Sequence, residues 1–302
     1  MAQADHMNNT YLLGNKPIRR IGFGAMQLAG PGVFGPPSDP EASRAVLRRA
    51  IELGVDHIDT AQFYGPDVVN DLIREALYPY PDDLKLVTKV GGRRDDAGAW
   101  LPAQTPAELR QGVEANLRSL QVERMDLVNL RLHHLEGDGD RVPLAEQLGE
   151  LQDLREEGKL DLVGLSNATL DDVRTALDLV DDLGEVQNAF GILDRTDEPI
   201  VEFTREHDVA FVPFFPLGSA FTSGPQTLAN DPAIRQVASK HDATPSQIAL
   251  AWLLAQYENV LLIPGTSSIA HLEENMAVGD IELDDSDLET LTEVQEVGNP
   301  IG

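Results

Sequence analysis

The hydrophobic positions of the chain follow two alternating patterns. Short apolar runs, typical of buried strands, are separated by stretches whose apolar residues recur every three or four positions, typical of helices that cover a sheet. The short runs predict strands that begin near residues 21, 57, 84, 125, 161, 185, 209 and 260. The longer stretches predict helices at residues 40–54, 67–77, 105–120, 143–157, 171–183, 199–207 and 244–256. Strands that alternate with helices in eight units indicate an α/β fold with parallel strands closed into a (β/α)8 TIM barrel.

Further elements are expected before and after this repeat. Residues 10–22 contain two short apolar runs around a Gly14-Asn15 turn, which predicts an N-terminal β-hairpin that plugs the bottom of the barrel. Two more helices are expected near residues 270–278 and 284–297, so the chain should end with a C-terminal helix.

The composition limits where the protein works and what it binds. A chain of 302 residues suits one barrel domain over residues 1–302, with residues 1–9 expected as a disordered tail. The 51 acidic and 23 basic residues give a net charge of −28, which repels nucleic acid and anionic membranes and favours a salt-rich cytoplasm. No apolar run has the length of a membrane span, so we expect a cytoplasmic monomer or small homo-oligomer. The chain has no cysteine, which excludes disulfides and thiol chemistry.

Ionisable side chains follow two of the predicted strands. Asp59 lies at the end of the strand that starts at His57, Tyr64 lies in the next loop, and Lys89 lies at the end of the following strand. If these strands are parallel neighbours, the three groups meet at the C-terminal rim, where such barrels place their working residues. The ammonium favours the phenolate and is expected to lower the tyrosine pKa, while the carboxylate holds the lysine, which predicts a proton donor. A plain internal ion pair is the alternative, but it leaves Tyr64 unexplained.

Six short segments follow one another in a recognisable order. They are DTAQFYG, VTKV, GLSN, VQNAF, FFPLG and IPGTSS, the last of which is followed by EEN. In this order they resemble the fingerprints of the aldo-keto reductases, and the resemblance covers almost the whole chain. The segments PYPDDL, VNLR, VPFFPLG and LLIPGTSS resemble in particular the bacterial pyridoxal reductases of that family. The resemblance implies an enzyme that reduces small carbonyl compounds with NADPH, with NADH as the alternative cofactor.

The resemblance also implies where the cofactor binds. Ser166, Asn167 and Gln187 match residues that bind the nicotinamide carboxamide, and Phe214 matches an aromatic residue that stacks on the ring. The other matching positions lie after later strands and are Leu217, Gly218, Gly265, Thr266, Ser267, His271, Glu274 and Asn275. Many members have an arginine for the 2′-phosphate where this chain has His271, so the preference for NADPH over NADH is weaker here.

The fourth catalytic position departs from the family pattern. Many members place a histidine five residues after the aspartate that opens the fourth strand, and here that position is Arg131. His133 is the rival candidate, although it is expected beyond the strand end. Arg131 keeps its charge at neutral pH, so we expect it to hold an anionic or phenolic aldehyde. His133 and His134 have no third ligand at a recognisable spacing, so no metal site is predicted.

Candidate substrate contacts lie in and near two long loops. Residues 29–40 are rich in glycine and proline, and residues 91–104 are expected to form a second loop. Phe34 and Trp100, one in each loop, are either loop anchors or walls of a substrate pocket. Met26 follows the first strand and, by the resemblance, lies on the pocket floor.

Two functions on this fold stay open from the sequence. One is a carbonyl reductase with Tyr64 as general acid, and the other is a nicotinamide-binding redox sensor or regulatory subunit. The intact set of Asp59, Tyr64 and Lys89 favours the enzyme. The chain offers no added interaction domain or basic tail in support of the sensor.

Overall fold

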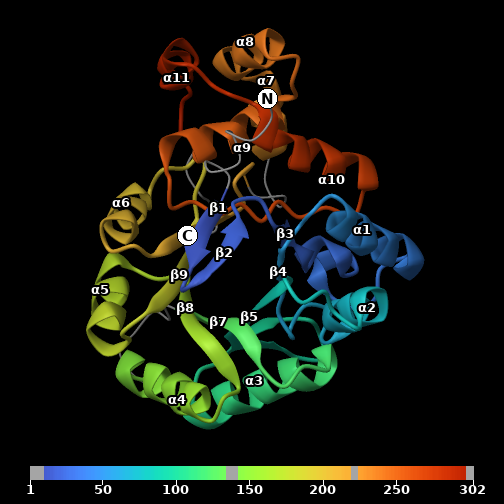
Figure 1. Cartoon of the computed structure of the whole chain (residues 1–302), viewed down its shortest axis with the longest axis vertical. Coiled ribbons are helices and arrows are strands. Elements are labelled where there is room, and N and C mark those ends of the chain that lie inside the picture. The colour runs from blue at the N-terminus through green and yellow to red at the C-terminus, as the bar shows by residue number, and fades with distance from the viewer. Residues whose placement is uncertain (1–9, 134–141, 219–223, 297–302) are drawn as a thin grey trace.

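Parallel strands form the centre of the molecule in the computed structural model, which describes residues 10–133, 142–218 and 224–296. Neighbouring strands pair in the order β3, β4, β5, β7, β8, β9, β10, and every pair in this series is parallel. They curl into a barrel with helices around it (Figure 1). The strands are β3 (Phe23–Gly24), β4 (His57–Asp59), β5 (Lys85–Arg94), β7 (Met125–Arg131), β8 (Leu160–Ser166), β9 (Leu183–Ala189) and β10 (Ala210–Phe214).

The barrel closes through the segment where the eighth strand is expected. The N–H of Leu261 donates to the carbonyl of Phe211 in β10, and the N–H of Leu262 donates to that of Arg20 before β3. Single parallel bridges therefore link this segment to both edges of the sheet. The apolar run over residues 21–28 predicts one strand, but β3 offers little length for pairing because the chain turns into a 3-10 helix at Ala25–Leu28. The predicted barrel is confirmed, but its first and last strands are shorter than expected.

Helices cover the outside of the barrel because most of them present an apolar stripe to the strands. α3 begins as predicted: Thr105 and Glu108 each accept a hydrogen bond from the backbone N–H of the other. α5 ends earlier than expected because Leu183 already begins β9. The helices that follow the strands are α1 (Pro40–Glu52), α2 (Val68–Leu77), α3 (Pro106–Leu120), α4 (Leu144–Glu156), α5 (Leu170–Leu179), α6 (Glu198–Glu206) and α9 (Pro245–Gln256).

α9 is unusual because six consecutive residues, 248–253, are all buried. Two helices that the sequence did not predict, α7 (Gly224–Asn230) and α8 (Pro232–Lys240), pack on its outer side. The expected tail helices are present as α10 (Ile269–Met276) and α11 (Asp285–Leu291), although α11 ends earlier than expected. α11 packs on α8. Figure 1 shows α7, α8 and α11 gathered at one side, outside the ring of barrel helices.

A β-hairpin covers the N-terminal end of the barrel, as predicted. β1 (Thr10–Leu13) pairs antiparallel with β2 (Lys16–Arg19), and Gly14 in the turn has a φ of 60°, which favours glycine. In Figure 1 the hairpin lies over the centre of the ring. It buries Leu13 and Ile18 against inward-facing side chains of the strands, among them Val87, Leu127, Ala210 and Val212.

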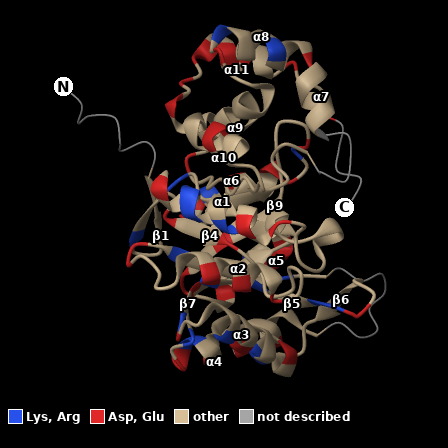
Figure 2. Ribbon diagram, turned by 90° about the vertical axis from the view of Figure 1, so that its right-hand side faces the viewer, with Lys and Arg blue, Asp and Glu red and all other residues tan. Residues whose placement is uncertain are grey.

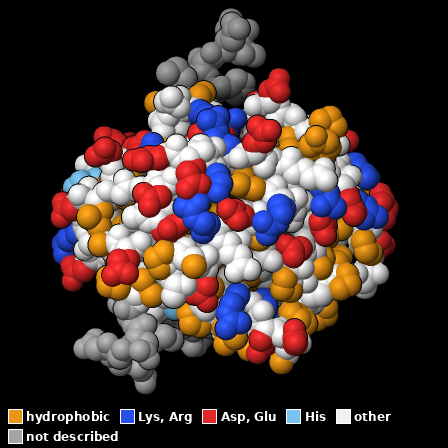
Figure 3. Space-filling view, turned by 90° about the horizontal axis from the view of Figure 1, so that it is seen from below, with side chains coloured by type: hydrophobic (Ala, Val, Ile, Leu, Met, Phe, Trp, Pro, Cys, Tyr) orange, Lys and Arg blue, Asp and Glu red, His pale blue; other side chains and the backbone are white. Residues whose placement is uncertain are grey.

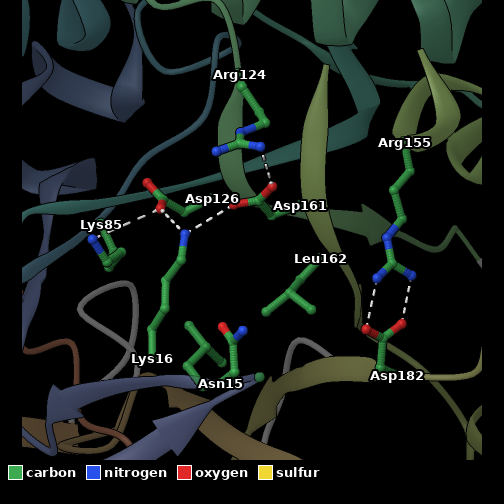
Figure 4. A pocket seen from close by; sticks show the side chains of 11 residues that line it. Asn15, Lys16, Lys85, Arg124, Asp126, Arg155, Asp161, Leu162 and Asp182 are labelled. Atoms are coloured by element: carbon green, nitrogen blue, oxygen red, sulfur yellow. Dashed lines mark hydrogen bonds and ion pairs between the residues drawn. The ribbon is translucent and has the colours of Figure 1, made fainter. Parts of the chain in front are cut away.

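Charged side chains surround a cavity of about 460 Å³ beside the hairpin turn. Lys16 of β2 reaches between two strands and pairs with Asp126 at 3.1 Å and with Asp161 at 2.9 Å (Figure 4). Arg155 and Asp182 pair through two contacts, of which the shorter measures 2.5 Å. We call this group the basal cluster, and its members are Lys16, Lys85, Arg124, Asp126, Arg155, Asp161 and Asp182.

The rim segment at residues 91–104 is more regular than predicted. β5 continues to Arg94 and pairs antiparallel with β6 (Trp100–Ala103). The carboxylate of Asp95 fixes the turn, because it accepts hydrogen bonds from the N–H groups of Ala97 at 3.0 Å and Ala99 at 2.8 Å. The prediction of a loop was therefore wrong. In Figure 2, β6 and β1 lie at opposite sides of the molecule, which separates the rim from the base.

The surface brings the scarce basic residues next to acidic ones. Arg110 of α3 pairs with Glu150 at 2.7 Å and with Glu157 at 2.8 Å, and Lys159 pairs with Glu114 at 2.9 Å. The face in Figure 3 shows basic side chains interspersed with acidic ones. Among the described residues, no helix is both long and apolar enough to span a bilayer.

Candidate active site

A buried ion pair lies at the C-terminal rim, between two neighbouring strands. Asp59 ends β4 and stands opposite Val87 of β5, which brings Lys89 of the same face close to it. The ammonium of Lys89 donates to the Asp59 carboxylate and, at 3.3 Å, to the carbonyl of Thr60. Each of the two side chains is 5% exposed. Burial is the largest single effect on Lys89 and lowers its pKa, but the Asp59 carboxylate and Tyr64 together outweigh it and the pKa is raised, so the lysine stays charged.

Tyr64 reaches this ion pair from the loop after β4. Its N–H donates to the carbonyl of Ala61 at 3.0 Å, and the ring of Phe63 packs edge-on against its ring at 5.5 Å. The Nζ atom of Lys89 lies 5.4 Å from the centre of the Tyr64 ring. Burial raises the pKa of Tyr64, and the charges of Lys89 and Arg131 offset this only in part. The expected lowering of this pKa was therefore wrong in its net direction, and the phenol stays protonated.

Two side chains of β9 extend the site into the barrel. Glu185 and Gln187 share the inward face because alternate residues of a strand point to the same side. Nε2 of Gln187 donates to Oδ2 of Asp59 at 2.8 Å and to Oε1 of Glu185 at 2.7 Å. Nδ2 of Asn129 in β7 donates to the same Glu185 oxygen at 2.7 Å. Burial raises the pKa of Glu185, while the hydrogen bond from Asn129 opposes this.

Arg131 is the second basic side chain of the site. Its Nη1 donates to Oγ of Ser166 at 3.3 Å, and its guanidinium carbon lies 5.6 Å from the centre of the Phe214 ring. Its charge acts to lower the pKa of Tyr64, against the larger effect of burial. β7 ends at Arg131, so His133 lies beyond the strand, as expected.

The predicted cofactor residues that follow β8 and β10 lie in turns. Asn167 has a φ of 57°, its N–H donates to the carbonyl of Gln187 at 2.9 Å, and its Nδ2 donates to that of Leu132 at 3.0 Å. Leu217 and Gly218 follow β10, and Gly218 has a φ of 78°, which favours glycine. These backbone contacts hold Asn167 beside Gln187 at the rim.

The last predicted cofactor segment leads from the closing strand into α10. A Cβ on Gly265 would lie 2.6 Å from the carbonyl oxygen of Gly24, so only glycine allows this approach. The Thr266 hydroxyl accepts from the N–H of Ser268 at 3.0 Å, and Ser268 caps α10 by accepting from the N–H of His271 at 3.4 Å. A capped helix start with hydroxyl groups suits a phosphate. The structure leaves Ser267, His271 and Glu274 exposed and buries Asn275.

Arg94 joins the two aromatic residues predicted to contact substrate. Its guanidinium carbon lies 3.9 Å from the centre of the Trp100 ring and 5.2 Å from that of Phe34. It also donates to the backbone carbonyls of Val33 at 2.9 Å and Gly98 at 2.6 Å, one in each of the two segments. Phe63 packs against Trp100 at 5.7 Å and so connects Trp100 to the tyrosine loop. Met26 lies partly buried in the 3-10 helix after β3, close to the rim.

Comparison with known proteins identifies the family. The model described as "Aldo/keto reductase family" matches residues 20–296. The chain belongs to the aldo-keto reductase family. It is 47% identical over 285 residues to pyridoxine 4-dehydrogenase of Escherichia coli strain K12, which covers 94% of this chain and 97% of that protein.

Solved aldo-keto reductases share the fold. An enzyme of Klebsiella pneumoniae in complex with NADP and acetate has a TM-score of 0.77 at 25% identity and covers 94% of each chain. An aldo-keto reductase of the same organism in complex with NADPH has the same TM-score and identity and covers 94% of this chain and 93% of that one. The predicted family and barrel are confirmed.

One unsatisfied polar atom in the site fits a nicotinamide carboxamide, independently of the family comparison. Oε1 of Gln187 is buried and has no hydrogen-bond partner among the residues that the structure describes. A buried acceptor without a partner costs free energy, and a carboxamide NH₂ group is a donor that satisfies it. Sequence reasoning missed Glu185 and Arg94, although Glu185 stands two residues before Gln187 and alternation could have revealed it.

Proposed function

We propose that the protein is an NADPH-dependent reductase of aldehydes and ketones, with Tyr64 as the general acid. The observation that carries this proposal is the buried contact of Lys89 with both Asp59 and the ring of Tyr64. Burying an ion pair is costly, so its position beside a protonated phenol calls for a reason other than stability. Membership of the aldo-keto reductase family supports the same reaction class.

Each group of the site has a part in the proton transfer. When bound, NADPH would supply the hydride for the carbonyl carbon, and negative charge would then develop on the carbonyl oxygen. The hydroxyl of Tyr64 donates a hydrogen bond to that oxygen and gives up its proton, which completes the alcohol. The charge of Lys89 stabilises the phenolate that remains, and Asp59 holds Lys89 in position. The raised pKa of Tyr64 keeps the proton available at neutral pH.

The cofactor would lie along the rim from β8 to α10. We assign the carboxamide to Ser166, Asn167 and Gln187 and the ring stacking to Phe214, whose flat side chain ends β10. The hydroxyl groups at the start of α10 suit the phosphates. NADPH is proposed over NADH because the Klebsiella pneumoniae relatives hold NADP and NADPH. His271 stands where many members have an arginine for the 2′-phosphate, which makes the preference weaker.

We propose pyridoxal as a substrate within the carbonyl class, with pyridoxine as its product. The similar Escherichia coli protein is named for pyridoxine, and a dehydrogenase and a reductase catalyse the same equilibrium in opposite directions. Pyridoxal is a flat aromatic aldehyde with a phenolic oxygen beside its carbonyl group. The wall formed by Phe34 and Trp100 suits the flat ring, and the fixed positive charge of Arg131 suits the phenolic oxygen.

The proposal is tested by NADPH oxidation with pyridoxal and a panel of other aldehydes. Tyr64→Phe keeps the packing ring but removes the acidic proton, so we expect it to bind NADPH normally and to lose roughly 10² to 10⁴-fold in turnover with every aldehyde. Tyr80→Phe is the matched control, because its hydroxyl donates at 2.8 Å to the carbonyl of Leu120, away from the site.

Two outcomes contradict the proposal. Near-normal turnover by Tyr64→Phe would reject Tyr64 as the acid. Tight NADPH binding by the wild type without reduction of any aldehyde would favour a redox sensor on the same fold.

A further inference from the structure

The side-chain amide of Gln187 is held between two carboxyl groups. Both of its N–H bonds are used, one toward Asp59 at 2.8 Å and the other toward Glu185 at 2.7 Å. The Asp59 carboxylate, which is paired with Lys89, accepts hydrogen bonds and cannot donate them, so a flipped amide would turn its oxygen toward a carboxylate oxygen. The flip is therefore unfavourable, and Oε1 must point away from both carboxyl groups.

The two carboxyl groups differ in what holds them. Asp59 is paired with Lys89, so it is fixed by the catalytic ion pair itself. Glu185 is 2% exposed and lies on the inward face of β9, where Nδ2 of Asn129 donates to it at 2.7 Å. A carboxyl group in such a place is costly, and a neighbouring amide is weaker compensation than a cation. Glu185 makes no hydrogen bond to Lys89 among the described contacts, and of its two amide partners it is Gln187 that also contacts the ion pair.

We propose that Glu185 is a positioning residue that locks the Gln187 amide, so that Oε1 of Gln187 accepts a hydrogen bond from the NH₂ group of the nicotinamide carboxamide. Oε1 is the buried atom of this amide that lacks a partner among the described residues. One fixed acceptor holds the carboxamide in one orientation and therefore presents one face of the ring to the substrate. This inference rests on the proposed cofactor but not on the proposed substrate.

The discriminating probe is an NADP⁺ analogue whose carboxamide is replaced by an acetyl group. The analogue keeps the carbonyl and the ring but has a methyl group where NADP⁺ has NH₂, so it cannot donate to Gln187. Calorimetry should show that the wild type binds NADP⁺ about tenfold more tightly than the analogue, as expected for one hydrogen bond to a buried acceptor. In Glu185→Leu the amide is held by Asp59 alone, and this preference should fall to about twofold or less.

Glu185→Gln is the matched control. Its side-chain oxygen still accepts from Gln187 and Asn129, so the tenfold preference for NADP⁺ should be retained. Glu185→Leu should also transfer hydride from both faces of deuterated NADPH, whereas the wild type and Glu185→Gln should use one face. A role in folding alone would change the melting temperature without changing the preference or the face.

The outcomes separate this inference from the proposed function. An unchanged preference in folded Glu185→Leu overturns the inference and leaves the enzyme intact, whereas no binding of NADP⁺ by the wild type overturns the proposed cofactor. Glu185→Leu leaves the Asn129 amide without its acceptor. If this variant does not fold, the double variant Glu185→Leu, Asn129→Leu removes that amide as well and repeats the test. The side-chain amide protons of wild-type Gln187 should exchange slowly with solvent in the absence of cofactor, and fast exchange of both would also overturn the inference.

Discussion

The rim and the base of this barrel both carry ion pairs, but the two sets differ in burial. At the rim, the Asp59 and Lys89 side chains are each 5% exposed. At the base, Lys16 is 38% exposed, and its partners Asp126 and Asp161 are 23% and 26% exposed. Water solvates the basal charges whether or not they pair, so each such pair contributes about 0 to 1 kcal/mol. At the rim each charge depends on the other.

This difference in burial matches a difference in role: the basal pairs attach the hairpin, and the rim pair lies beside the phenol of Tyr64. Lys16 links the hairpin to the ends of β7 and β8, and this contact adds to the apolar packing of Leu13 and Ile18. Apolar side chains of similar volume in place of a buried ion pair often leave the free energy of unfolding unchanged or raise it. Stability alone therefore does not explain the buried pair at the rim. A charge kept out of water acts strongly on its neighbours, and the neighbour here is the phenol of Tyr64. The low exposure of Asp59 and Lys89 therefore distinguishes the catalytic candidate from the basal pairs.

The largest expected effect comes from Lys89→Met, which breaks the rim pair. The Asp59 carboxylate then lacks its cation, so we expect a loss of roughly 3 to 5 kcal/mol in the free energy of unfolding. Turnover should fall roughly 10² to 10⁴-fold, because the phenolate left by Tyr64 loses its stabilising charge. Since Lys89 lowers the pKa of Tyr64, its removal should raise that pKa and move the alkaline limb of the activity profile to higher pH. Denaturant unfolding and pH–rate profiles measure these effects.

The matched control for this variant is Lys85→Met. Lys85 lies on the same strand, four residues earlier, in the basal cluster and 4.0 Å from Asp126. Its replacement should leave the pH profile unchanged. The raised pKa of Lys89 contributes stability that is fully present below the unfolded value of about 10.4 and is lost as pH rises through the folded value. The wild type should therefore lose more stability than Lys89→Met on alkaline titration, and equal losses would contradict the buried pair.

The barrel was predictable because most of its helices and strands bury one face, and this gives a regular spacing of apolar residues in the sequence. Period-two and helical patterns found every barrel helix, and strand ends located Asp59, Lys89 and Arg131 at one rim. The helices α7 and α8 were missed because they pack on α9 rather than on the sheet, so no strand pattern frames them.

Local contacts and burial account for the other differences. The turn at Asp95 depends on a side chain that accepts from the backbone N–H groups of Ala97 and Ala99, which an apolar pattern does not register. The pKa of Tyr64 depends on the depth of burial as well as on neighbouring charge. The sequence predicts, through the fold, which charged residues lie near Tyr64, but it does not predict how deeply the phenol is buried.

A smaller effect is expected from Arg131→Leu, which removes the fixed charge beside the phenol. Pyridoxal has a phenolic oxygen that a guanidinium can hold, whereas benzaldehyde does not. We expect kcat/KM for pyridoxal to fall more than that for benzaldehyde, by the roughly 1.5 to 3 kcal/mol of a hydrogen bond to a charged group. Arg124→Leu is the matched control, because Arg124 precedes β7 and pairs with Asp161 at the base.

Three results would assign Arg131 differently. Equal losses on both aldehydes would make Arg131 a general stabiliser of the carbonyl oxygen. A selective loss in His133→Ala alone would move the role to that histidine. The same selective loss in Arg124→Leu would show that the effect does not arise at the rim.

The smallest effect is expected from Lys16→Met, which removes the partly exposed pairs of Lys16 with Asp126 and Asp161. Its two pairs lie partly in water, so the free energy of unfolding should fall by about 1 kcal/mol or less in dilute buffer. Molar salt shortens the Debye length to about 3 Å, so the difference between this variant and the wild type should shrink as salt is added. The melting temperature of both proteins should meanwhile rise with salt, because screening relieves the repulsion among charges that sum to −28. Melting curves from low to molar sodium chloride test both statements. A flat wild-type curve would reject the salt-rich habitat, and a large loss in Lys16→Met that molar salt leaves unchanged would show that the basal pairs are shielded from water like the rim pair.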